Sequence, residues 1–172
     1  MSKQIRAIFA GTFDPNHYGH RDLIKRGADL FDELTIGVYD HRIPSKKLIF
    51  SIDKRCELID EAIKELDNVN VVRFSGLLVD FADIIGATVL VRGMRVFSDF
   101  EFEFRSALAN RRLNPKIETV NLMTQEEHTF LSGTTLREIA SLGGDVSSMV
   151  PPIVEKALYE YYAEDRDWYK SQ

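Results

Sequence analysis

Residues 8–20 read IFAGTFDPNHYGH and join an apolar run to a helix start through one tight turn. The apolar run predicts a first strand that ends at Ala10, and Gly11 lets the backbone turn and approach a ligand closely. We expect the following helix to begin near Tyr18 or Gly19. A helix N-terminus presents free N–H groups and the positive end of the helix dipole, which suits a phosphate. The stretch therefore predicts a strand, an anion site and a helix in succession.

Three side chains in this stretch could serve the same anion. Thr12 offers a hydroxyl, and His17 and His20 are three positions apart, which places both imidazoles on one side of the first helical turn. The two histidines could instead be surface residues or metal ligands, but no H-E-x-x-H motif or cysteine pair supplies a third ligand. Gly11 and Gly19 stand eight apart, unlike the glycines of G-x-G-x-x-G, which disfavours a nicotinamide enzyme.

Strand-like and helix-like patterns alternate along the chain. Short apolar runs rich in β-formers occur at residues 5–10, 34–39, 69–74, 88–93 and 117–123. Helical patterns occur at residues 21–31, 51–66, 77–86, 98–113 and 130–142, with Ser51 and Ser98 as expected N-caps. The alternation predicts a single α/β domain with a five-stranded parallel sheet covered by helices on both faces. Ligands of such sheets bind beyond the carboxyl ends of the strands, so we expect functional residues in the loops that follow strands.

Composition narrows the class of protein. The 172 residues include 22 basic and 27 acidic side chains, so the overall field opposes binding to nucleic acid. Cys56 is the single cysteine, which excludes an internal disulfide and predicts a small core residue. No apolar run suits a membrane span or a signal peptide, which predicts a cytoplasmic protein with no membrane contact. We expect one domain over residues 1–163 and a polar C-terminal tail over residues 164–172.

Three later loops carry basic or hydroxyl side chains. Lys46 follows the second strand, where a merely solvated loop is the alternative. Arg92 and Arg95 stand where the fourth strand ends, a placement that packing explains poorly and phosphate binding explains well. Ser132–Thr134 begin a helix after the fifth strand, where an ordinary capped helix is the alternative. Because the carboxyl ends of parallel strands share one edge, these loops and the first one are expected to converge on one crevice.

Together these residues carry a family resemblance. GTFDP (11–15) followed by HYGH (17–20) resembles the signature of the nucleotidyltransferase superfamily. PSKK (44–47), VRGMR (91–95), DFEFE (99–103) and LSGTTLR (131–137) occur in the order seen in bacterial phosphopantetheine adenylyltransferases. The resemblance implies a Rossmann-like fold and reversible transfer of the adenylyl group of ATP to 4′-phosphopantetheine, giving dephospho-coenzyme A and pyrophosphate. It further implies Mg²⁺ as cofactor, a homohexamer and inhibition by coenzyme A.

The resemblance also assigns roles to individual residues. Catalysis falls to His20 and Lys46, and binding of 4′-phosphopantetheine falls to Thr12, Lys46, Leu78 and Arg92. The positions matched to ATP binding are Thr12, Phe13, His20, Gly93, Met94, Arg95, Glu103, His128, Thr129, Phe130, Leu131, Ser132, Gly133 and Thr134. We expect Mg²⁺ to be held by the ATP phosphates and not by protein side chains. Because a phosphate monoester is already an anionic nucleophile, direct in-line transfer needs no covalent enzyme intermediate.

Three features depart from the family pattern. Gly133 stands where many relatives carry the second of three serines, and His128 replaces an aromatic residue found in some members. Two extra residues between the second strand and the lysine segment change the length of the loop that carries Lys46. The aromatic residues Phe97, Phe100, Phe102 and Phe104 are expected to serve packing, with the interleaved Glu101 and Glu103 on a solvated face.

Two other functions stay open at this point. The first is a nucleotidyltransferase of the same fold that acts on nicotinamide mononucleotide or glycerol 3-phosphate, which the PSKK and VRGMR segments disfavour. The second is a non-catalytic module that binds a nucleotide as a signal. The pairing of His20 with Lys46 disfavours this second reading, because a sensor needs binding groups but no donor to a transition state.

Overall fold

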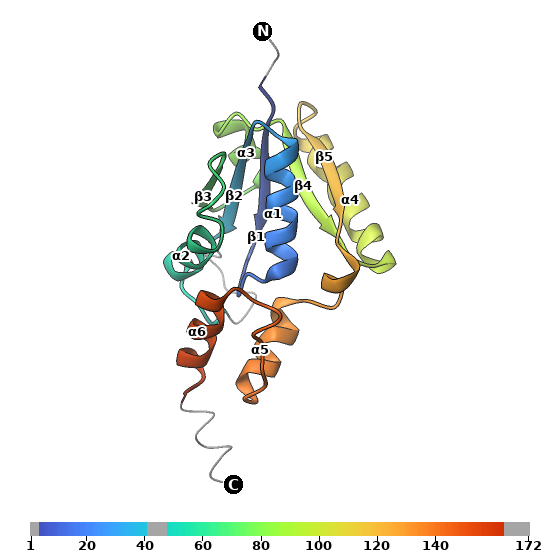
Figure 1. Cartoon of the computed structure of the whole chain (residues 1–172). Helices are drawn as coiled ribbons and strands as arrows, with labels where there is room; N and C mark the ends of the chain where they lie inside the picture. Colours follow the sequence, from blue (N-terminus) through green and yellow to red (C-terminus); the bar gives the residue numbers. More distant parts are fainter. Residues whose placement is uncertain (1–3, 41–47, 164–172) are drawn as a thin grey trace.

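The computed structural model describes residues 4–40 and 48–163, in which five parallel strands form one sheet in the order β3-β2-β1-β4-β5 (Figure 1). The strands are β1 (Arg6–Gly11), β2 (Glu33–Tyr39), β3 (Val69–Phe74), β4 (Val89–Met94) and β5 (Glu118–Met123). The chain adds strands first on one side of β1 and then, with β4, on the other. A crevice forms at such a reversal, beyond the carboxyl ends of β1 and β4.

The helices cover both faces of the sheet, as the sequence predicts. They are α1 (Tyr18–Leu30), α2 (Ile52–Ala62), α3 (Leu78–Ile84), α4 (Phe97–Leu113), a 3₁₀ turn η1 (Glu126–His128), α5 (Gly133–Ser141) and α6 (Pro152–Tyr161). Leu23 of α1 and Ile59 of α2 pack with Ile36 on one face. Val79 of α3 packs with Leu90 on the opposite face. Successive strand side chains point to opposite faces, so strands covered on both sides must be apolar throughout.

A third core cluster lies beside the end of the sheet. Leu136 of α5, Leu158 of α6 and Leu58 of α2 are fully buried together. Figure 1 shows α5 and α6 beyond the arrowheads of the strands, at the end of the molecule opposite the N-terminus. This packing brings the start of α5 to the same edge of the sheet as the loops that follow the strands.

The expected helix caps had different outcomes. Ser51 caps α2, since its hydroxyl accepts the N–H of Lys54 at 3.2 Å. The expected cap at Ser98 is wrong, because Ser98 lies inside α4. The carboxylate of Asp99 instead accepts the N–H groups of Arg95 and Val96 at 3.0 and 3.3 Å. An anionic acceptor that reaches two donors outcompetes a hydroxyl at a helix start.

The face expected for α4 is also wrong. Phe97 is 91% exposed and Phe104 is 52% exposed, whereas Glu103 is only 7% exposed and is the buried residue of this helix. The rings of Phe97, Phe100 and Phe104 stack on one another along the outside of the helix. Helical geometry puts Glu103 on the side that faces the sheet, where it pairs with the half-buried guanidinium of Arg92.

Three further predictions concern Cys56, Lys46 and the C-terminal residues. Cys56 is partly buried and packs against the first core cluster, as predicted. Lys46 and the expected tail at residues 164–172 lie outside the described residues. Within the described part of the chain, no helix is long and apolar enough to cross a membrane.

Candidate active site

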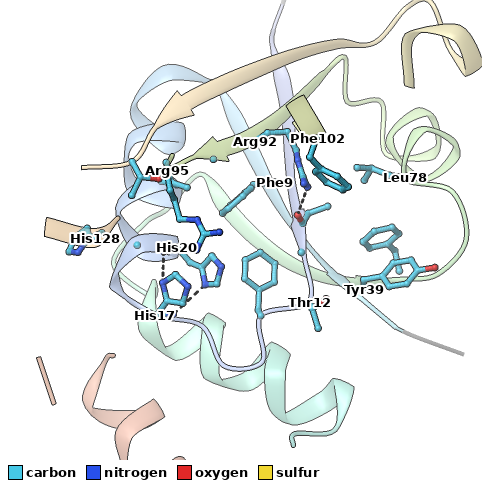
Figure 2. Close-up of a pocket in the computed structure, with 18 of the residues that line it drawn as sticks. Phe9, Thr12, His17, His20, Tyr39, Leu78, Arg92, Arg95, Phe102 and His128 are labelled. Atoms are coloured by element: carbon cyan, nitrogen blue, oxygen red, sulfur yellow. Dashed lines mark hydrogen bonds between the residues drawn. The ribbon is translucent and has the colours of Figure 1, made fainter. Parts of the chain in front are cut away.

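A cavity of about 510 Å³ opens at the carboxyl edge of the sheet (Figure 2). Every strand contributes to its wall at or just after its end: Ala10 and Gly11 of β1, Tyr39 of β2, Phe74 of β3, Arg92 and Gly93 of β4, and Thr124 after β5. The carboxyl ends of parallel strands therefore bring together residues that are far apart in sequence, as the loop analysis predicts.

The two ends of this cavity differ in chemistry. In Figure 2, His17, His20, Arg95 and His128 gather at one end, and Tyr39, Leu78 and Phe102 lie at the other. Arg92 stands between the two groups. One end therefore suits an anion, and the other suits an apolar chain or ring. A ligand that carries both features would fill the cavity.

His17 and His20 form a reciprocal cap at the start of α1. His17 is the N-cap residue, and its Nδ1 accepts the N–H of His20 at 3.4 Å. The Nδ1 of His20 in turn accepts the N–H of His17 at 3.3 Å. The two rings stack with their centroids 3.7 Å apart. The two histidines therefore satisfy two of the N–H groups that a helix start leaves without an intrahelical acceptor.

This cap sets the protonation of His20. An Nδ1 that accepts a hydrogen bond carries no proton, so the neutral ring carries its proton on Nε2. Burial, with a smaller contribution from the positive charge of Arg95, lowers the pKa of His20 to about 3. Burial also lowers the pKa of His17, helped by His20, Arg95 and His128. His20 is therefore a neutral imidazole with a single N–H donor. The readings of these histidines as surface residues do not fit this geometry.

Gly19 lets the paired histidines lie this close to the helix. A Cβ at Gly19 would stand 3.1 Å from the ring of His17. Phe13 closes the other side, with its ring centroid 4.9 Å from that of His20 in an edge-on arrangement. Phe13 has a φ of +51°, a left-handed conformation that side chains rarely adopt. The His20 ring is thus held by a neighbour on each side.

Arg92 is held in place before any ligand arrives. Its Nε and Nη2 each donate to the carboxylate of Glu103 at 2.8 Å, and its Nη1 donates to the carbonyl of Ala10 at 3.2 Å. Glu103 is buried, so this bidentate pair is shielded from solvent. The guanidinium nevertheless lines the cavity, which leaves its remaining N–H groups available to an anion.

Arg95 connects β4 to the segment before α5. Its Nη1 donates to the carbonyl of Leu131 at 3.0 Å, and its Nε donates to Asp99 at 3.3 Å. Gly93, two residues earlier, allows β4 to pass close to α1, because a Cβ there would collide with a methyl group of Leu23. The cationic head of Arg95 therefore reaches the end of the cavity that suits an anion, from a strand packed tightly against α1.

A second cavity of about 400 Å³ lies between the first turn and the start of α5. Gly133, Thr134 and Arg137 of α5 line it. Thr12, Phe13 and His20 line both cavities. These three residues therefore lie at the boundary between the two cavities, of which the first is bounded by β4 and the second by the start of α5.

The start of α5 uses its hydroxyls as caps. Ser132 accepts the N–H of Thr135 at 3.1 Å and shares a hydrogen bond with the Thr135 hydroxyl at 2.9 Å. Gly133 allows the turn at Asp14 to approach, because a Cβ there would stand 3.0 Å from the Asp14 carbonyl. A serine in place of Gly133 would meet that carbonyl, which is a physical reason for the departure from the family pattern.

The structure brings most of the predicted site residues together. Of the described ones, ten line the two cavities: Thr12, Phe13, His20, Leu78, Arg92, Gly93, Arg95, His128, Gly133 and Thr134. Glu103 lies behind Arg92, and Leu131 supplies the carbonyl that Arg95 binds. Met94, Thr129, Phe130 and Ser132 line neither of these cavities. Lys46 lies outside the described residues.

Several lining residues escaped the sequence analysis. Tyr39, Phe74 and Phe102 form the apolar end, and no pattern separates such aromatics from core residues. Thr124 follows β5, so the rule of searching after strands could have found it. Its buried hydroxyl has no hydrogen-bond partner among the described residues. Arg137 stands in the quoted LSGTTLR segment but received no role.

The described residues offer no cluster of metal ligands. Within residues 4–40 and 48–163, no three or more histidine, cysteine or acidic side chains gather in a way that could hold a metal ion. The groups that line the polar end of the first cavity are neutral or cationic. They fit a metal that arrives with an anionic ligand better than one bound by the protein.

Comparison with known proteins places this site in context. The model of the cytidylyltransferase-like family matches residues 8–139. A phosphopantetheine adenylyltransferase from Caldanaerobacter subterraneus subsp. tengcongensis is 47% identical over 156 residues, which are 91% of this chain and 96% of that protein. Another from Desulfosudis oleivorans is 47% identical over 154 residues, 90% of each chain.

Solved structures of distant relatives share the fold. One is described as a nicotinate-nucleotide adenylyltransferase from Vibrio parahaemolyticus, with a TM-score of 0.67 and 21% identity over 91% of this chain and 99% of that one. The lipopolysaccharide core biosynthesis protein from Thermoplasma volcanium has a TM-score of 0.54 and 23% identity, covering 72% of this chain and 99% of that one. At these identities the likeness concerns the fold alone.

Proposed function

Because the chain belongs to the cytidylyltransferase-like family and, within it, to the phosphopantetheine adenylyltransferases, we propose that it transfers the adenylyl group of ATP to 4′-phosphopantetheine. The products are dephospho-coenzyme A and pyrophosphate, and the reaction is reversible. This is the penultimate step of coenzyme A synthesis. One observation supports the proposal above the others: Thr12, Phe13 and His20 lie where two cavities meet, which is where a phosphorus atom between two substrates must lie.

The acceptor fits the larger cavity. The methyl and methylene groups of the pantetheine arm would lie against Leu78 and Phe102, and the phosphate of 4′-phosphopantetheine would meet Arg92. Glu103 and the Ala10 carbonyl hold the guanidinium of Arg92, so binding the phosphate costs little side-chain entropy. We assign Thr12 to contact both substrates from its place between the cavities. Lys46 is proposed to approach the same phosphate region.

ATP would bridge the two cavities. Arg95 and the N–H groups of Gly133 and Thr134 are proposed to bind the β- and γ-phosphates, because a helix start favours negative charge. Gly93 and Met94 would lie against the nucleoside, with His128–Leu131 on its other side. Glu103 is assigned to the adenine end only by family resemblance. Its bidentate bond to Arg92 supports a role in positioning the acceptor phosphate.

The chemistry requires no protein nucleophile. An oxygen of the acceptor phosphate forms a bond to the α-phosphorus of ATP while the bond from that phosphorus to the bridging oxygen breaks, and pyrophosphate takes the electron pair. The Nε2–H of His20 would donate to an α-phosphoryl oxygen, where negative charge grows in the transition state. Lys46 would add a positive charge at the same group. Neutral His20 keeps its donor without needing to gain or lose a proton.

Magnesium is proposed to enter with ATP. Its ligands would be phosphate oxygens, which suits the neutral and cationic side chains at the polar end of the cavity. Bound there, it would neutralise charge on the triphosphate and on the departing pyrophosphate. Arg95, Thr134 and His20 line the two cavities and are proposed to face this anion.

Further properties are proposed from the resemblance. We propose a cytoplasmic homohexamer in which residues 1–163 form the catalytic domain and residues 164–172 a polar tail. The stacked, exposed rings of Phe97, Phe100 and Phe104 on α4 support contact with another copy, because an isolated chain gains nothing by exposing them. Coenzyme A would inhibit by occupying the cavity that releases dephospho-coenzyme A. The mass of the protein in solution tests the oligomer.

One assay tests the function. Purified protein is incubated with magnesium and ATP, and 4′-phosphopantetheine, nicotinamide mononucleotide and glycerol 3-phosphate are supplied in parallel, with a CTP series alongside. We expect pyrophosphate release only with ATP and 4′-phosphopantetheine, and a product with the mass of dephospho-coenzyme A. Release with another acceptor would overturn the substrate assignment. Binding of ATP without release would favour the nucleotide-sensing reading.

A further inference from the structure

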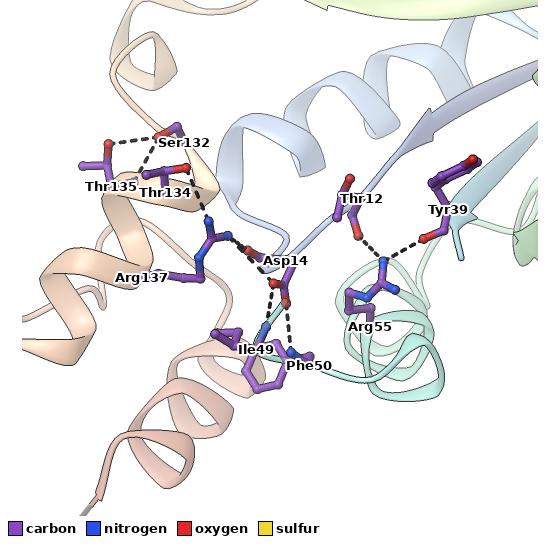
Figure 3. A network of polar contacts seen from close by, with 10 residues as sticks. All are labelled: Thr12, Asp14, Tyr39, Ile49, Phe50, Arg55, Ser132, Thr134, Thr135 and Arg137. Atoms are coloured by element: carbon purple, nitrogen blue, oxygen red, sulfur yellow. Dashed lines mark hydrogen bonds and ion pairs between the residues drawn. The ribbon is translucent and has the colours of Figure 1, made fainter. Parts of the chain in front are cut away.

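The turn at Thr12–Asp14 is held by two arginines that lie outside the predicted site set (Figure 3). Arg55, in the first turns of α2, donates from Nη1 to the carbonyl of Thr12 at 2.7 Å and to the carbonyl of Tyr39 at 3.0 Å. Tyr39 ends β2, and Thr12 follows β1. One guanidinium therefore ties together the ends of two neighbouring strands at the edge where the site lies.

Arg137 holds the other side of the turn. Its Nη1 donates to the carbonyl of Asp14 and lies 3.8 Å from the carboxylate of the same residue, while Nη2 donates to the Thr134 hydroxyl at 3.4 Å. The buried carboxylate of Asp14 also accepts the N–H groups of Ile49 and Phe50 at 2.9 and 3.1 Å. The turn is thus fastened to α5 and to the segment that enters α2.

Phe13 lies between the two fastened carbonyls in a strained conformation. A left-handed φ such as its +51° is unfavourable for a residue with a side chain, because the Cβ atom crowds the carbonyl oxygen. Such a conformation persists only where surrounding contacts determine it. The hydrogen bonds from Arg55 to the Thr12 carbonyl and from Arg137 to the Asp14 carbonyl hold the backbone on each side of Phe13. The Phe13 ring then rests edge-on against His20.

Stability alone explains Arg55 poorly. The residue is 2% exposed, and its Nε has no hydrogen-bond partner among the described residues. Burial lowers its pKa, against the opposing influence of Asp14, Cys56 and Asp40. An apolar side chain of similar volume would avoid the cost of burying this charge. What an apolar residue could not do is donate to two carbonyls at once.

We propose that Arg55 and Arg137 are positioning residues that hold the Thr12–Asp14 turn in its left-handed conformation, and thereby fix Thr12 and the Phe13–His20 ring pair against the substrates. The inference rests on the proposed adenylyl transfer for its kinetic consequence. Its structural consequence at His20 is independent of that function. Release of either carbonyl lets Phe13 relax, and a displacement of about 1 Å at a reacting group can cost about 10²-fold in rate.

The test uses substitutions of Arg55 in the full-length protein. Arg55→Met keeps much of the volume and removes both donors, and Arg55→Lys keeps the charge but lacks the planar fork of guanidinium donors. Arg73→Lys is the matched control, because Arg73 is an exposed arginine that pairs with Asp53 at 3.1 Å. Circular dichroism melting selects an assay temperature at which every variant is folded. We then measure kcat and KM for ATP and 4′-phosphopantetheine.

We expect kcat to fall about 10²-fold in Arg55→Met and about tenfold in Arg55→Lys, with KM values changed by less than about threefold. Arg137→Lys should lower kcat in the same way, and Arg73→Lys should leave it unchanged. Should Arg55→Met fail to fold, Arg55→Lys carries the comparison.

A spectroscopic reading separates positioning from a loss of stability. The rings of His20 and Phe13 meet edge-on with their centroids 4.9 Å apart, so the NMR frequency of the His20 Cε1 proton should move in the Arg55 variants and not in Arg73→Lys; comparison with His20→Asn assigns the signal. An unchanged kcat in the folded variants, or an unmoved His20 signal, would overturn the proposal. A wild-type protein without transfer activity would overturn the proposed function instead. The His20 signal would still show whether Arg55 holds the Thr12–Asp14 turn and, through it, the Phe13–His20 ring pair.

Discussion

The starts of α1 and α5 are both helix N-termini that face the site, yet they are built differently. At α1 the cap is a histidine that is 5% exposed, and its ring stacks on a second histidine. At α5 the cap is the hydroxyl of Ser132, which is partly exposed and already bonded to Thr135. One helix start therefore buries its polar side chains among rings, and the other keeps them near solvent.

The difference indicates a division of roles. The reciprocal cap at α1 fixes one tautomer of His20 and one direction for its donor, so the site there depends on particular side chains. At α5 the side chains are used within the cap, and the first N–H groups of the helix have no intrahelical acceptor. Binding there depends on the backbone, which explains how Gly133 can replace a serine. We therefore expect substitutions at α1 to affect turnover and those at α5 to affect binding.

The largest expected effect is at His20. His20→Ala should lower kcat by about 10²–10³-fold, because it removes a donor to charge that grows in the transition state, while KM for ATP changes less. The matched substitution at α5, Thr134→Ala, should mainly raise KM for ATP. Steady-state kinetics of both folded variants makes the comparison. Full activity of His20→Ala would show that His20 has no role in catalysis. Equal losses of kcat in His20→Ala and Thr134→Ala would show that the starts of α1 and α5 do not have different roles.

A smaller contrast is expected when each N-cap is removed. His17→Ala and Ser132→Ala should each lower the free energy of unfolding by about 1 kcal/mol, measured by urea denaturation. Only His17→Ala also releases the ring of His20, so its kcat should fall by about tenfold, whereas Ser132→Ala should leave kcat nearly unchanged. A similar kcat in the two variants would show that the histidine cap stabilises the helix and does nothing for the site.

The smallest expected effect is a dependence of the free energy of unfolding on pH, which arises from His20 at the start of α1. The folded pKa of His20 is about 3, well below the value near 6.5 expected after unfolding, so the unfolded chain binds a proton that the folded chain does not. Stability is therefore present above pH 6.5 and is lost as the pH falls toward 3. Between pH 6.5 and 5.5 this amounts to about 1 kcal/mol for one histidine.

Chemical denaturation across this range measures the effect. The carboxylates of Asp99 and Asp145 have lowered pKa values, so they stay ionised between pH 6.5 and 5.5 and contribute little there. His20→Asn should show a shallower decline in the free energy of unfolding than the wild type. The same decline in both proteins would contradict the burial of a neutral His20.

The strands and the edge of the sheet that carries the site were open to prediction. Continuous apolar runs such as residues 34–39 can be buried on both faces, and parallel strands end at a shared edge. Thr12, Arg92 and Gly133 could therefore be expected to converge before any coordinates existed. The 3.6-residue repeat likewise predicted α2, with Ser51 as its cap.

The sequence-based predictions were wrong where the same local sequence pattern is compatible with either a buried or an exposed position. Alternating Phe and Glu in α4 predicted packed rings and solvated carboxylates, but the rings of Phe97 and Phe104 are exposed and Glu103 is buried, whereas Glu101 is exposed as predicted. The reason is Arg92, a cation on the sheet that attracts Glu103 inward across 11 positions of sequence. Ser98 lost the cap to Asp99 in a similar way, because a charged acceptor one residue later reaches two donors. Pairings between elements decide such cases, and local sequence does not record them.

Three features could be obtained from the amino-acid sequence alone: the order of strands and helices along the chain, the glycine and histidine positions of the first turn, and the family to which the chain belongs. These follow from periodicity, from backbone freedom at glycine and from residue types at fixed spacing. Three other features could be seen only in the folded structure. His17 and His20 cap one another, and Arg55 and Arg137 donate hydrogen bonds to the carbonyls on either side of Phe13. The turn itself lies between two cavities. The physical reason is that hydrogen bonds, burial and pKa depend on distances between segments, and those distances exist only after the core has packed.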